Sequence, residues 1–189
     1  NTNDSTIKAY IDNWYKTNIL GTANEEYLAD NIFCNDRSIS NDNTGTGAGT
    51  TRTNYRWYYG PWESGNHNDN MKLVCPQQND AFTVSDTTKG NGALTYPIGL
   101  LSTDEIVLAG GWNAINSGYY LYSGQAWWAS SPGNFISIRA YVRRVDMNGD
   151  ANRFDNVYGS YGVRPVFNLK ADALAQGTGT ASDPYRISS

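Results

Sequence analysis

The sequence predicts an α+β fold, in which helices and short antiparallel strands form one domain. Two segments have helical signals, and the segment from Trp127 to Leu169 has strand and hairpin signals. The chain has 189 residues, close to the usual size of a domain with a single hydrophobic core. We therefore expect residues 1–189 to form one domain, with residues 171–189 as an exit strand towards a neighbouring module of a longer surface protein.

The first predicted helix lies in the segment STIKAYIDNWYKTNI, which begins at Ser5. Serine is a favoured N-cap residue, because its side chain accepts a hydrogen bond from an amide of the first turn. Apolar side chains then recur at the spacing of one helix face, at Ile7, Tyr10, Ile11 and Trp14. This pattern predicts an amphipathic helix that packs on the core.

The second predicted helix lies in the segment STDEIVLAGG. Ser102 and Glu105 have the spacing of a capping box, in which each side chain bonds the backbone amide of the other residue. Gly110 and Gly111 end this helix, because glycine readily adopts the backbone conformation that follows a helix C-terminus.

Weaker signals predict strands before and after the second helix. Before it, we expect an extended segment at YLADNIFCNDRS, a surface loop at SNDNTGTGAGTTRTN and a short strand that runs up to Cys75. After it, side chains alternate with period two, so that one face has Ile136, Ile138, Ala140 and Val142 and the other has Ser137, Arg139, Tyr141 and Arg143. This alternation predicts a half-buried strand whose Ile and Val side chains face the core.

The Asn148–Gly149 pair that follows predicts a tight hairpin turn, because both residues tolerate the positive φ angles of such turns. We expect the returning strand to run from Arg153 to Tyr158. A third strand is predicted at GVRPVFNL, with Val163, Phe167 and Leu169 on a common face. Its proline indicates an edge position or a bulge, because proline donates no backbone hydrogen bond.

Composition argues against several classes of function. The net charge of -4 argues against a nucleic-acid partner, which needs a concentrated basic face. No apolar run approaches the length of about 20 residues that crosses a bilayer, so this segment inserts into no membrane. Tyr, Trp, Gly, Asn, Ser and Thr are abundant instead, which is typical of extracellular, loop-rich binding proteins. We expect an extracellular or cell-surface location.

Cysteine and histidine are scarce. Cys34 and Cys75 form one possible pair, which an oxidising compartment would join as a disulfide. His67 is the single histidine, and its loop offers no obvious nucleophile, so we read it as exposed. We expect no zinc site, no catalytic residue and no cofactor.

The DMNGD turn also resembles the start of a calcium-binding loop, because acidic and amide side chains alternate from Asp146 to Asn152. The match fails at the sixth and twelfth positions, where Ala151 and Val157 replace the expected Gly and Glu. We prefer the hairpin turn, and calcium stays as the alternative.

Several segments in a fixed order resemble a family of secreted and pilin-like proteins of Gram-positive gut bacteria: YLADNIFCNDRS, LTYPIGLLSTDEIVLAGG, YYLYSGQAWWASSP, GVRPVFNLK and GTGTASDPYRI. That family in turn resembles the C-type-lectin-like fold of formylglycine-generating enzymes and of the variable proteins of diversity-generating retroelements. The resemblance implies two helices, small twisted antiparallel sheets and long loops, with WWASSP and GVRP as scaffold. Formylglycine-generating enzymes use cysteines late in the chain; none follows Cys75 here, so the resemblance does not extend to oxidase chemistry.

Candidate ligand-binding residues lie at and between these two scaffold segments. Trp128 is a candidate stacking platform at the rim, whereas we read Trp127 as a core anchor. On the predicted outer face, Arg139, Tyr141 and Arg143 either contact a ligand or cover a solvated sheet, and the sequence leaves both open. The loops add side chains that suit recognition: Asn134, Asn152, Arg153, Asp155, Tyr158 and Tyr161.

These observations predict a non-catalytic, adhesin- or receptor-like domain on a bacterial surface, which binds a protein or a glycan. Its binding surface requires Trp128, Tyr141 and Arg143 to be exposed. The first alternative is a structural, pilin-like subunit that self-associates in a surface fibre. The second is a glycan-active enzyme, which needs two carboxylates that face each other across a cleft. Asp104 and Glu105 do not fit that role, because neighbours in the first turn of a helix point in different directions.

Overall fold

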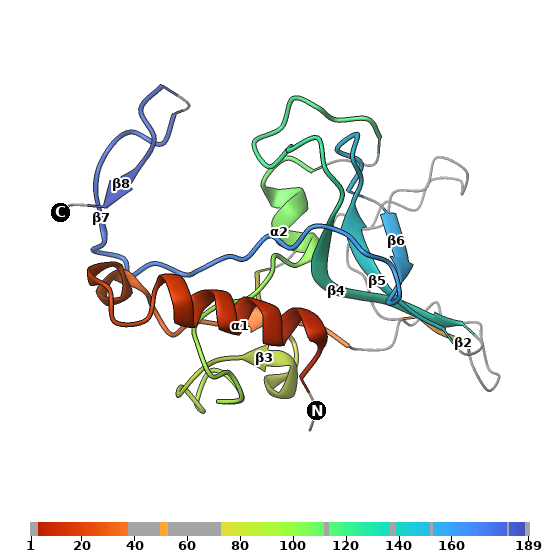
Figure 1. The fold of residues 1–189 in the computed structure, drawn as a ribbon, viewed down its shortest axis with the longest axis horizontal. Coiled ribbons are helices and arrows are strands. Elements are labelled where there is room, and N and C mark those ends of the chain that lie inside the picture. Colours follow the sequence, from red (N-terminus) through yellow and green to blue (C-terminus); the bar gives the residue numbers. More distant parts are fainter. Residues whose placement is uncertain are drawn as a thin grey trace.

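A computed structural model of the chain describes residues 4–37, 50–52, 73–111, 114–136, 139–151, 153–180 and 182–187. Within these ranges the fold is α+β, as predicted, with two α-helices and three small antiparallel sheets (Figure 1). Most of the predicted surface loop at SNDNTGTGAGTTRTN lies outside the described residues, and so does His67.

Helix α1 spans Thr6–Asn18 and lies across one side of the molecule (Figure 1). Its predicted N-cap is confirmed, because the Ser5 hydroxyl oxygen accepts a hydrogen bond of 3.1 Å from the amide of Lys8. The inner face of the helix packs into a hydrophobic core formed by Ile11, Tyr15 and Ile98.

The Tyr15 side chain anchors the turn that follows α1. Its hydroxyl donates a hydrogen bond of 3.1 Å to Glu25, which belongs to the short 3-10 helix η1 (Ala23–Tyr27). The other carboxylate oxygen of Glu25 accepts a bond of 2.8 Å from the amide of Gly21. Burial, followed by the hydrogen bond to Glu25 and the charge of Glu25, raises the pKa of Tyr15 to about 12. Tyr15 is therefore a neutral donor at physiological pH.

Helix α2 spans Thr103–Leu108 and has the predicted capping box. The Ser102 hydroxyl oxygen accepts a bond of 3.3 Å from the amide of Glu105, and the Glu105 carboxylate accepts one of 2.7 Å from the amide of Ser102. Gly110 follows the helix with a φ of +97°, which glycine adopts without strain. Ile106 anchors the helix in a second core.

The largest sheet has four antiparallel strands in the order β2-β4-β5-β6 (Figure 1). They span Thr50–Arg52, Trp127–Ile136, Arg139–Val145 and Arg153–Asn156. Ile136 at the end of β4 lies opposite Arg139 at the start of β5, so the chain reverses direction between them. The prediction of one continuous strand over residues 136–143 is therefore wrong. A period of two indicates extended backbone but does not show where a strand turns back.

The hairpin predicted after β5 is confirmed. The Gly149 amide donates a hydrogen bond of 2.9 Å to the carbonyl oxygen of Asp146, and Gly149 has a φ of +84°. Strand β6 then pairs with β5, with Arg153 opposite Arg144. The Asn148 side chain accepts a bond of 3.1 Å from an amide of the same turn. The DMNGD pattern is thus accounted for by a hairpin.

Two further sheets in the described part of the chain have two strands each. They pair β1 (Phe33–Cys34) with β3 (Ala81–Phe82), and β7 (Leu174–Gln176) with β8 (Arg186–Ile187). The strand predicted up to Cys75 is wrong for residues 73–75, because β1 pairs instead with β3, which follows the short 3-10 helix η2 (Gln78–Asp80). In place of one exit strand, β7 and β8 form a hairpin that projects from the body (Figure 1).

GVRPVFNL does not form the predicted strand, although all its residues are described. The segment makes only isolated bridges, such as Val166 with Gly99 and Leu169 with Leu28. Pro165 has no backbone donor, which prevents a regular ladder. Val163 and Phe167 still pack against the core under α1.

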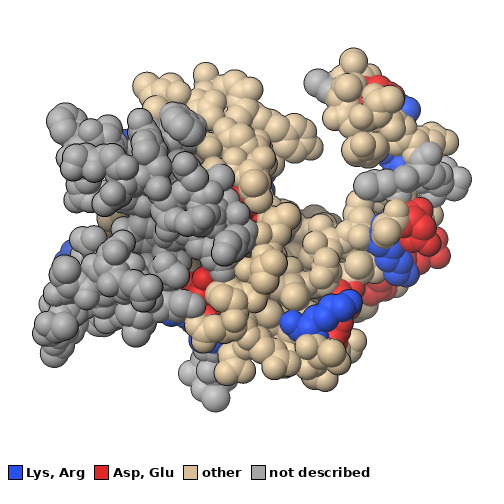
Figure 2. All heavy atoms as spheres, turned by 180° about the vertical axis from the view of Figure 1, so that it is seen from behind, with Lys and Arg blue, Asp and Glu red and all other residues tan. Residues whose placement is uncertain are grey.

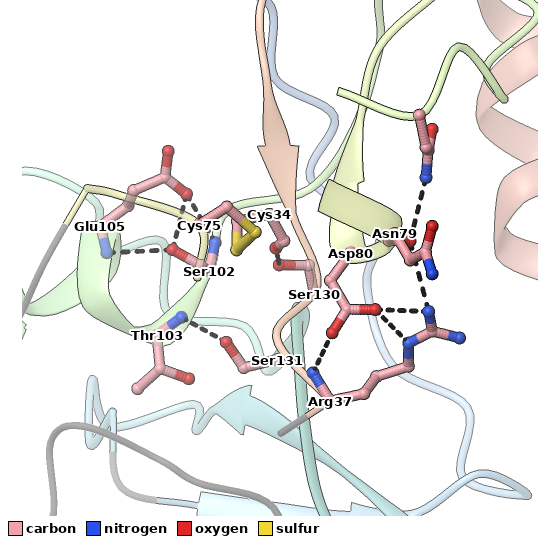
Figure 3. The surroundings of a disulfide bond; sticks show 11 residues. Cys34, Arg37, Cys75, Asn79, Asp80, Ser102, Thr103, Glu105, Ser130 and Ser131 are labelled. Carbon is pink, nitrogen blue, oxygen red and sulfur yellow. Dashed lines mark hydrogen bonds and ion pairs between the residues drawn. A yellow bond between two sulfur atoms is a disulfide. The ribbon is translucent and has the colours of Figure 1, made fainter. Parts of the chain in front are cut away.

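A disulfide joins Cys34 to Cys75, so the pair that the sequence allowed is formed (Figure 3). Beside it, the Ser130 hydroxyl of β4 donates a bond of 3.1 Å to the carbonyl oxygen of Cys34. The amide of Thr103 donates one of 2.9 Å to the Ser131 hydroxyl. The middle of β4 is therefore tied to β1 and to the start of α2, which supports the reading of WWASSP as scaffold.

Candidate functional site

Trp128 and Arg143 are buried, not exposed: their exposed fractions are 4% and 3%. Adjacent strand residues point to opposite faces, and both faces of the sheet are covered at this end. Trp127 lies opposite Val145 and belongs to the core below α2, which confirms it as a core anchor. Trp128, on the other face, packs against Tyr161. The prediction that Trp128 and Arg143 form a solvent-exposed surface is therefore wrong.

The segment around Gly162 covers the second face of the sheet. The amide of Trp128 donates a hydrogen bond of 3.0 Å to the carbonyl oxygen of Gly162, whose own amide donates one of 2.9 Å to Ala126. The ring of Tyr161 meets Trp128 edge-on, with ring centroids 4.9 Å apart. The Arg144 guanidinium lies over the Tyr161 ring, 4.6 Å from its centroid. Local alternation does not reveal this coverage, because the covering segment lies further along the chain.

We call Trp128, Arg144, Asp146, Asp155 and Tyr161 the Arg144 network. Arg144 forms an ion pair of 3.0 Å with Asp146 and one of 3.6 Å with Asp155. The Tyr161 hydroxyl donates a hydrogen bond to Asp155, which lowers the pKa of Asp155 and raises that of Tyr161. Each charged group in the network has a partner, as expected of a structural cluster.

Arg143 lies on the face of β5 that also carries Val145, a core residue. Its guanidinium lies 5.3 Å from the ring centroid of Phe154 on β6. The Tyr141 ring meets the same Phe154 edge-on at 5.7 Å. The burial of Arg143 follows from its position beside the core end of β5, since Val145 is only two residues further along the same face.

Of the other predicted site residues, Arg153 reaches the edge of the Arg144 network: it forms an ion pair of 2.8 Å with Asp150 and one of 3.9 Å with Asp146. Arg139, Arg153 and Tyr158 are exposed. Asn152 and the side chain of Asn134 lie outside the described residues. The structure thus brings together Trp128, Asp155 and Tyr161 in the Arg144 network, with the exposed Arg153 at its edge.

A different surface carries Tyr120, the most exposed of the large apolar side chains in the described part of the chain. Residues 114–126, which connect α2 to β4, form what we call the neutral loop, because the sequence has no charged residue between Glu105 and Arg139. Within it, Tyr120 is 90% exposed and Ile115 is 77% exposed. Met147, in the adjoining turn between β5 and β6, is 65% exposed. Large apolar side chains this open, gathered at one end of a molecule, are a feature of interaction surfaces.

The neutral loop is fixed at its base. The Asn116 amide donates a bond of 3.0 Å to Asn148, and the Asn116 side chain donates one of 2.9 Å to Gly110. Tyr119 and Leu121 pack against the core below α2. Arg164 of GVRP donates a hydrogen bond to the Leu121 carbonyl oxygen and lies over the Trp127 ring, so it ties GVRP to the loop. These contacts hold the backbone on either side of Tyr120.

The loop and the β5–β6 turn lie side by side at one end of the molecule (Figure 1). On the face that Figure 2 shows, the lobe at upper centre, which contains the loop, is tan. The sequence interpretation missed this site. The sequence does contain a signal for this surface, because residues 106–138 include no Asp, Glu, Lys, Arg or His. Period-two alternation and turn residues instead indicated the strands that follow, where the site was predicted.

A hollow of about 40 Å³ lies beside the disulfide and is lined by Ile32, Cys34, Asp36, Leu73, Ser102, Asp104, Glu105 and Ser131. It has room for water but not for a sugar ring. The Glu105 carboxylate in it is held by the capping box of α2 (Figure 3).

The described ranges contain neither a metal-binding cluster nor a membrane-spanning helix. No group of three or more His, Cys, Asp or Glu residues there could hold a metal ion. None of the helices in these ranges has the length and apolar character needed to span a bilayer.

Comparison with known proteins identifies one related family. The model of the family described as "Domain of unknown function (DUF6273)" matches residues 3–171. Searches of curated proteins and of solved structures returned no match. The match includes the sheet, the neutral loop and the Arg144 network, and stops before the β7–β8 hairpin.

Proposed function

We propose that this chain, which belongs to the DUF6273 family, is a non-catalytic extracellular domain that binds its ligand at the neutral loop. The observation that carries the proposal is the combination of strong exposure and fixed backbone at one end of the molecule. Tyr120 is 90% exposed, yet the chain on both sides of it is hydrogen-bonded or packed on the core. An aromatic side chain on an ordered backbone loses little entropy when it binds.

The extracellular location is supported by the disulfide and by composition. Disulfides form and persist in oxidising compartments, and Cys34 and Cys75 are joined. Few residues are charged, 17% of the chain, and hydroxyl and amide side chains supply much of the polar surface.

A C-type-lectin-like architecture belongs to the same proposal. Its support is the order of the resembling segments, together with the scaffold role of WWASSP and GVRP. Trp127, Trp128 and Ala129 are buried, and Arg164 bonds to the base of the neutral loop.

The test is binding of the purified domain to printed arrays of glycans and of extracellular proteins. We expect signals that Tyr120→Ala and Ile115→Ala weaken. The matched control is Tyr10→Ala, because Tyr10 is 60% exposed on α1 and lies outside the neutral loop. Equal loss with the control, or no loss with Tyr120→Ala, would refute the proposed surface. A mass measurement in solution separates the fibre alternative, which predicts assembly of the isolated domain.

A further inference from the structure

We infer that the ligand of the neutral loop is a neutral polysaccharide. This inference rests on the proposed function and adds the chemical class of the ligand. It follows from three features of the loop: its lack of charge, the exposure of its aromatic side chain and the neutral hydrogen-bonding groups beside it.

Charge is the first feature. No Asp, Glu, Lys, Arg or His occurs from Ile106 to Ile138. The carboxylates of the adjoining turn are already paired, Asp146 with Arg144 at 3.0 Å and Asp150 with Arg153 at 2.8 Å. A phosphate, sulfate or carboxylate on the ligand would therefore find no cationic partner in the loop, since recognition of such groups relies on Arg and Lys.

The aromatic side chain is the second feature. The Tyr120 ring combines an apolar face with a polar tip, and its exposure leaves the face open. The C–H face of a pyranose ring is apolar while its rim carries hydroxyls, so a tyrosine ring matches it in both respects. Ile115 adds an aliphatic contact from the same loop.

The third feature is the set of neutral donors and acceptors on the loop. Ser117, Ser123 and Gln125 are exposed. Hydroxyl and amide side chains both donate and accept hydrogen bonds, which is what sugar hydroxyls require. Three neutral groups on the same loop as an exposed aromatic ring suit a polyhydroxylated ligand better than a charged one.

A second copy of the chain or another protein fits this surface less well. Along the loop, the small or polar residues Asn116, Ser117 and Gly118 separate the exposed Ile115 from Tyr119 and the exposed Tyr120. The core of a protein interface is instead a continuous, closely packed apolar patch with a polar rim. The neutral loop lacks that continuity.

The test uses affinity electrophoresis of the purified domain in gels that contain soluble starch, mixed-linkage β-glucan, mannan or xylan, with polygalacturonate as the acidic arm. We expect at least one of the four neutral polysaccharides to retard the protein. Tyr120→Ala should weaken the retardation by about tenfold or more. Tyr158→Ala, which changes a tyrosine that is 74% exposed outside the loop, should weaken it by less than about twofold. Retardation should be unchanged from about 50 to 500 mM salt, because no ion pair forms.

The outcomes separate this inference from the proposed function. Retardation by polygalacturonate alone, loss of retardation at high salt, or no retardation by any of the four neutral polysaccharides would each overturn the neutral-polysaccharide inference. If a protein on the array binds and needs Tyr120, the surface stands and the ligand class is wrong. If a neutral polysaccharide binds the Tyr120→Ala variant as well as it binds the native chain, both the proposed binding surface and the ligand inference that rests on it are wrong. A circular dichroism melt of each variant confirms that it is folded.

Discussion

The backbone amide of Asn116 donates a hydrogen bond of 3.0 Å to the carbonyl oxygen of Asn148, and this bond joins the neutral loop to the turn between β5 and β6. The two segments of the chain approach closely here. A Cβ atom added to Gly149 would lie 2.1 Å from the carbonyl oxygen of Asn116, so only glycine fits at this position. Gly149 therefore serves two purposes: it forms the turn between β5 and β6, and it allows the neutral loop to lie against that turn.

The first prediction concerns Gly149→Ala. We expect a loss of about 2 kcal/mol or more in the free energy of unfolding, because the methyl group meets backbone and the φ of +84° is unfavourable for alanine. Gly21→Ala is the matched control, with a φ of +75° and no atom within 4 Å of an added Cβ. Urea denaturation of both variants measures the difference. Equal losses would show that the loop and the turn are not in close contact.

The second prediction separates Trp128 from Tyr120. Trp128→Ala should destabilise the fold by about 3 to 5 kcal/mol, because it empties a buried site against Tyr161. Tyr120→Ala should change stability by less than about 0.5 kcal/mol, because the side chain is open to solvent. Thermal and urea denaturation measure both values. A stable, folded Trp128→Ala variant would contradict the buried position.

The third prediction concerns Asp30, whose carboxylate accepts hydrogen bonds of 2.7, 2.7 and 3.0 Å from the amides of Val84, Ser85 and Asp86. Burial alone would raise its pKa, but these bonds outweigh burial and hold the pKa of Asp30 below its ordinary value. A lowered pKa in the folded state stabilises the fold above the ordinary aspartate pKa. That contribution is lost as the pH falls through the lowered folded value.

Asp30→Asn should therefore cost about 2 to 3 kcal/mol at neutral pH, and the difference from the native chain should shrink as the solution is acidified. Urea denaturation at several pH values measures this dependence. The control is Asp172→Asn, an exposed aspartate without a hydrogen bond or ion pair among the described residues. A pH-independent cost for Asp30→Asn would contradict the linkage.

The fourth prediction concerns the disulfide. Its two cysteines are 41 residues apart, so the cross-link should contribute about 3 to 4 kcal/mol by restricting the unfolded chain. We expect the Cys34→Ala, Cys75→Ala double variant to lose this amount and to become insensitive to reductant. Denaturation with and without dithiothreitol measures both effects. A native chain whose stability is the same with and without reductant would contradict this role.

The fifth prediction concerns the Arg144 network. Arg144→Lys keeps the charge but loses the planar group that stacks on Tyr161 and reaches two carboxylates, so it should cost about 1 to 2 kcal/mol. Arg139→Lys is the control, because Arg139 is exposed at the other end of β5. Equal stability of the two variants would mean that the network contributes only charge.

Features that depend on a few neighbouring residues could be predicted from the sequence. The Ser5 cap, the Ser102–Glu105 capping box and the Asn148–Gly149 hairpin are all confirmed, because each rests on hydrogen bonds within one turn of the chain. The disulfide had only one possible pairing, because the chain has two cysteines. The uncharged stretch from Ile106 to Ile138 could also have been found, although its placement on the surface could not.

The prediction that Trp128 and Arg143 are exposed is wrong because it needed long-range information. Alternation correctly placed Arg139, Tyr141 and Arg143 on one face of a strand, but it did not show which face is covered. Arg143 is buried because that face continues to Val145 in the core, and Trp128 is buried because the segment around Gly162 returns to cover it. Arg144, the centre of the actual network, gave no signal that set it apart from its neighbour.

The sequence by itself determined the class of fold, the helix caps and the hairpin turn, because backbone hydrogen bonds between close neighbours decide them. Only the tertiary structure decided that β4 and β5 are separate strands, that both faces of the sheet are covered near Trp127 and Trp128, and that Tyr120 is open to solvent. These outcomes depend on which distant segment packs on which face, and burial is decided by that packing and not by the polarity of a residue alone.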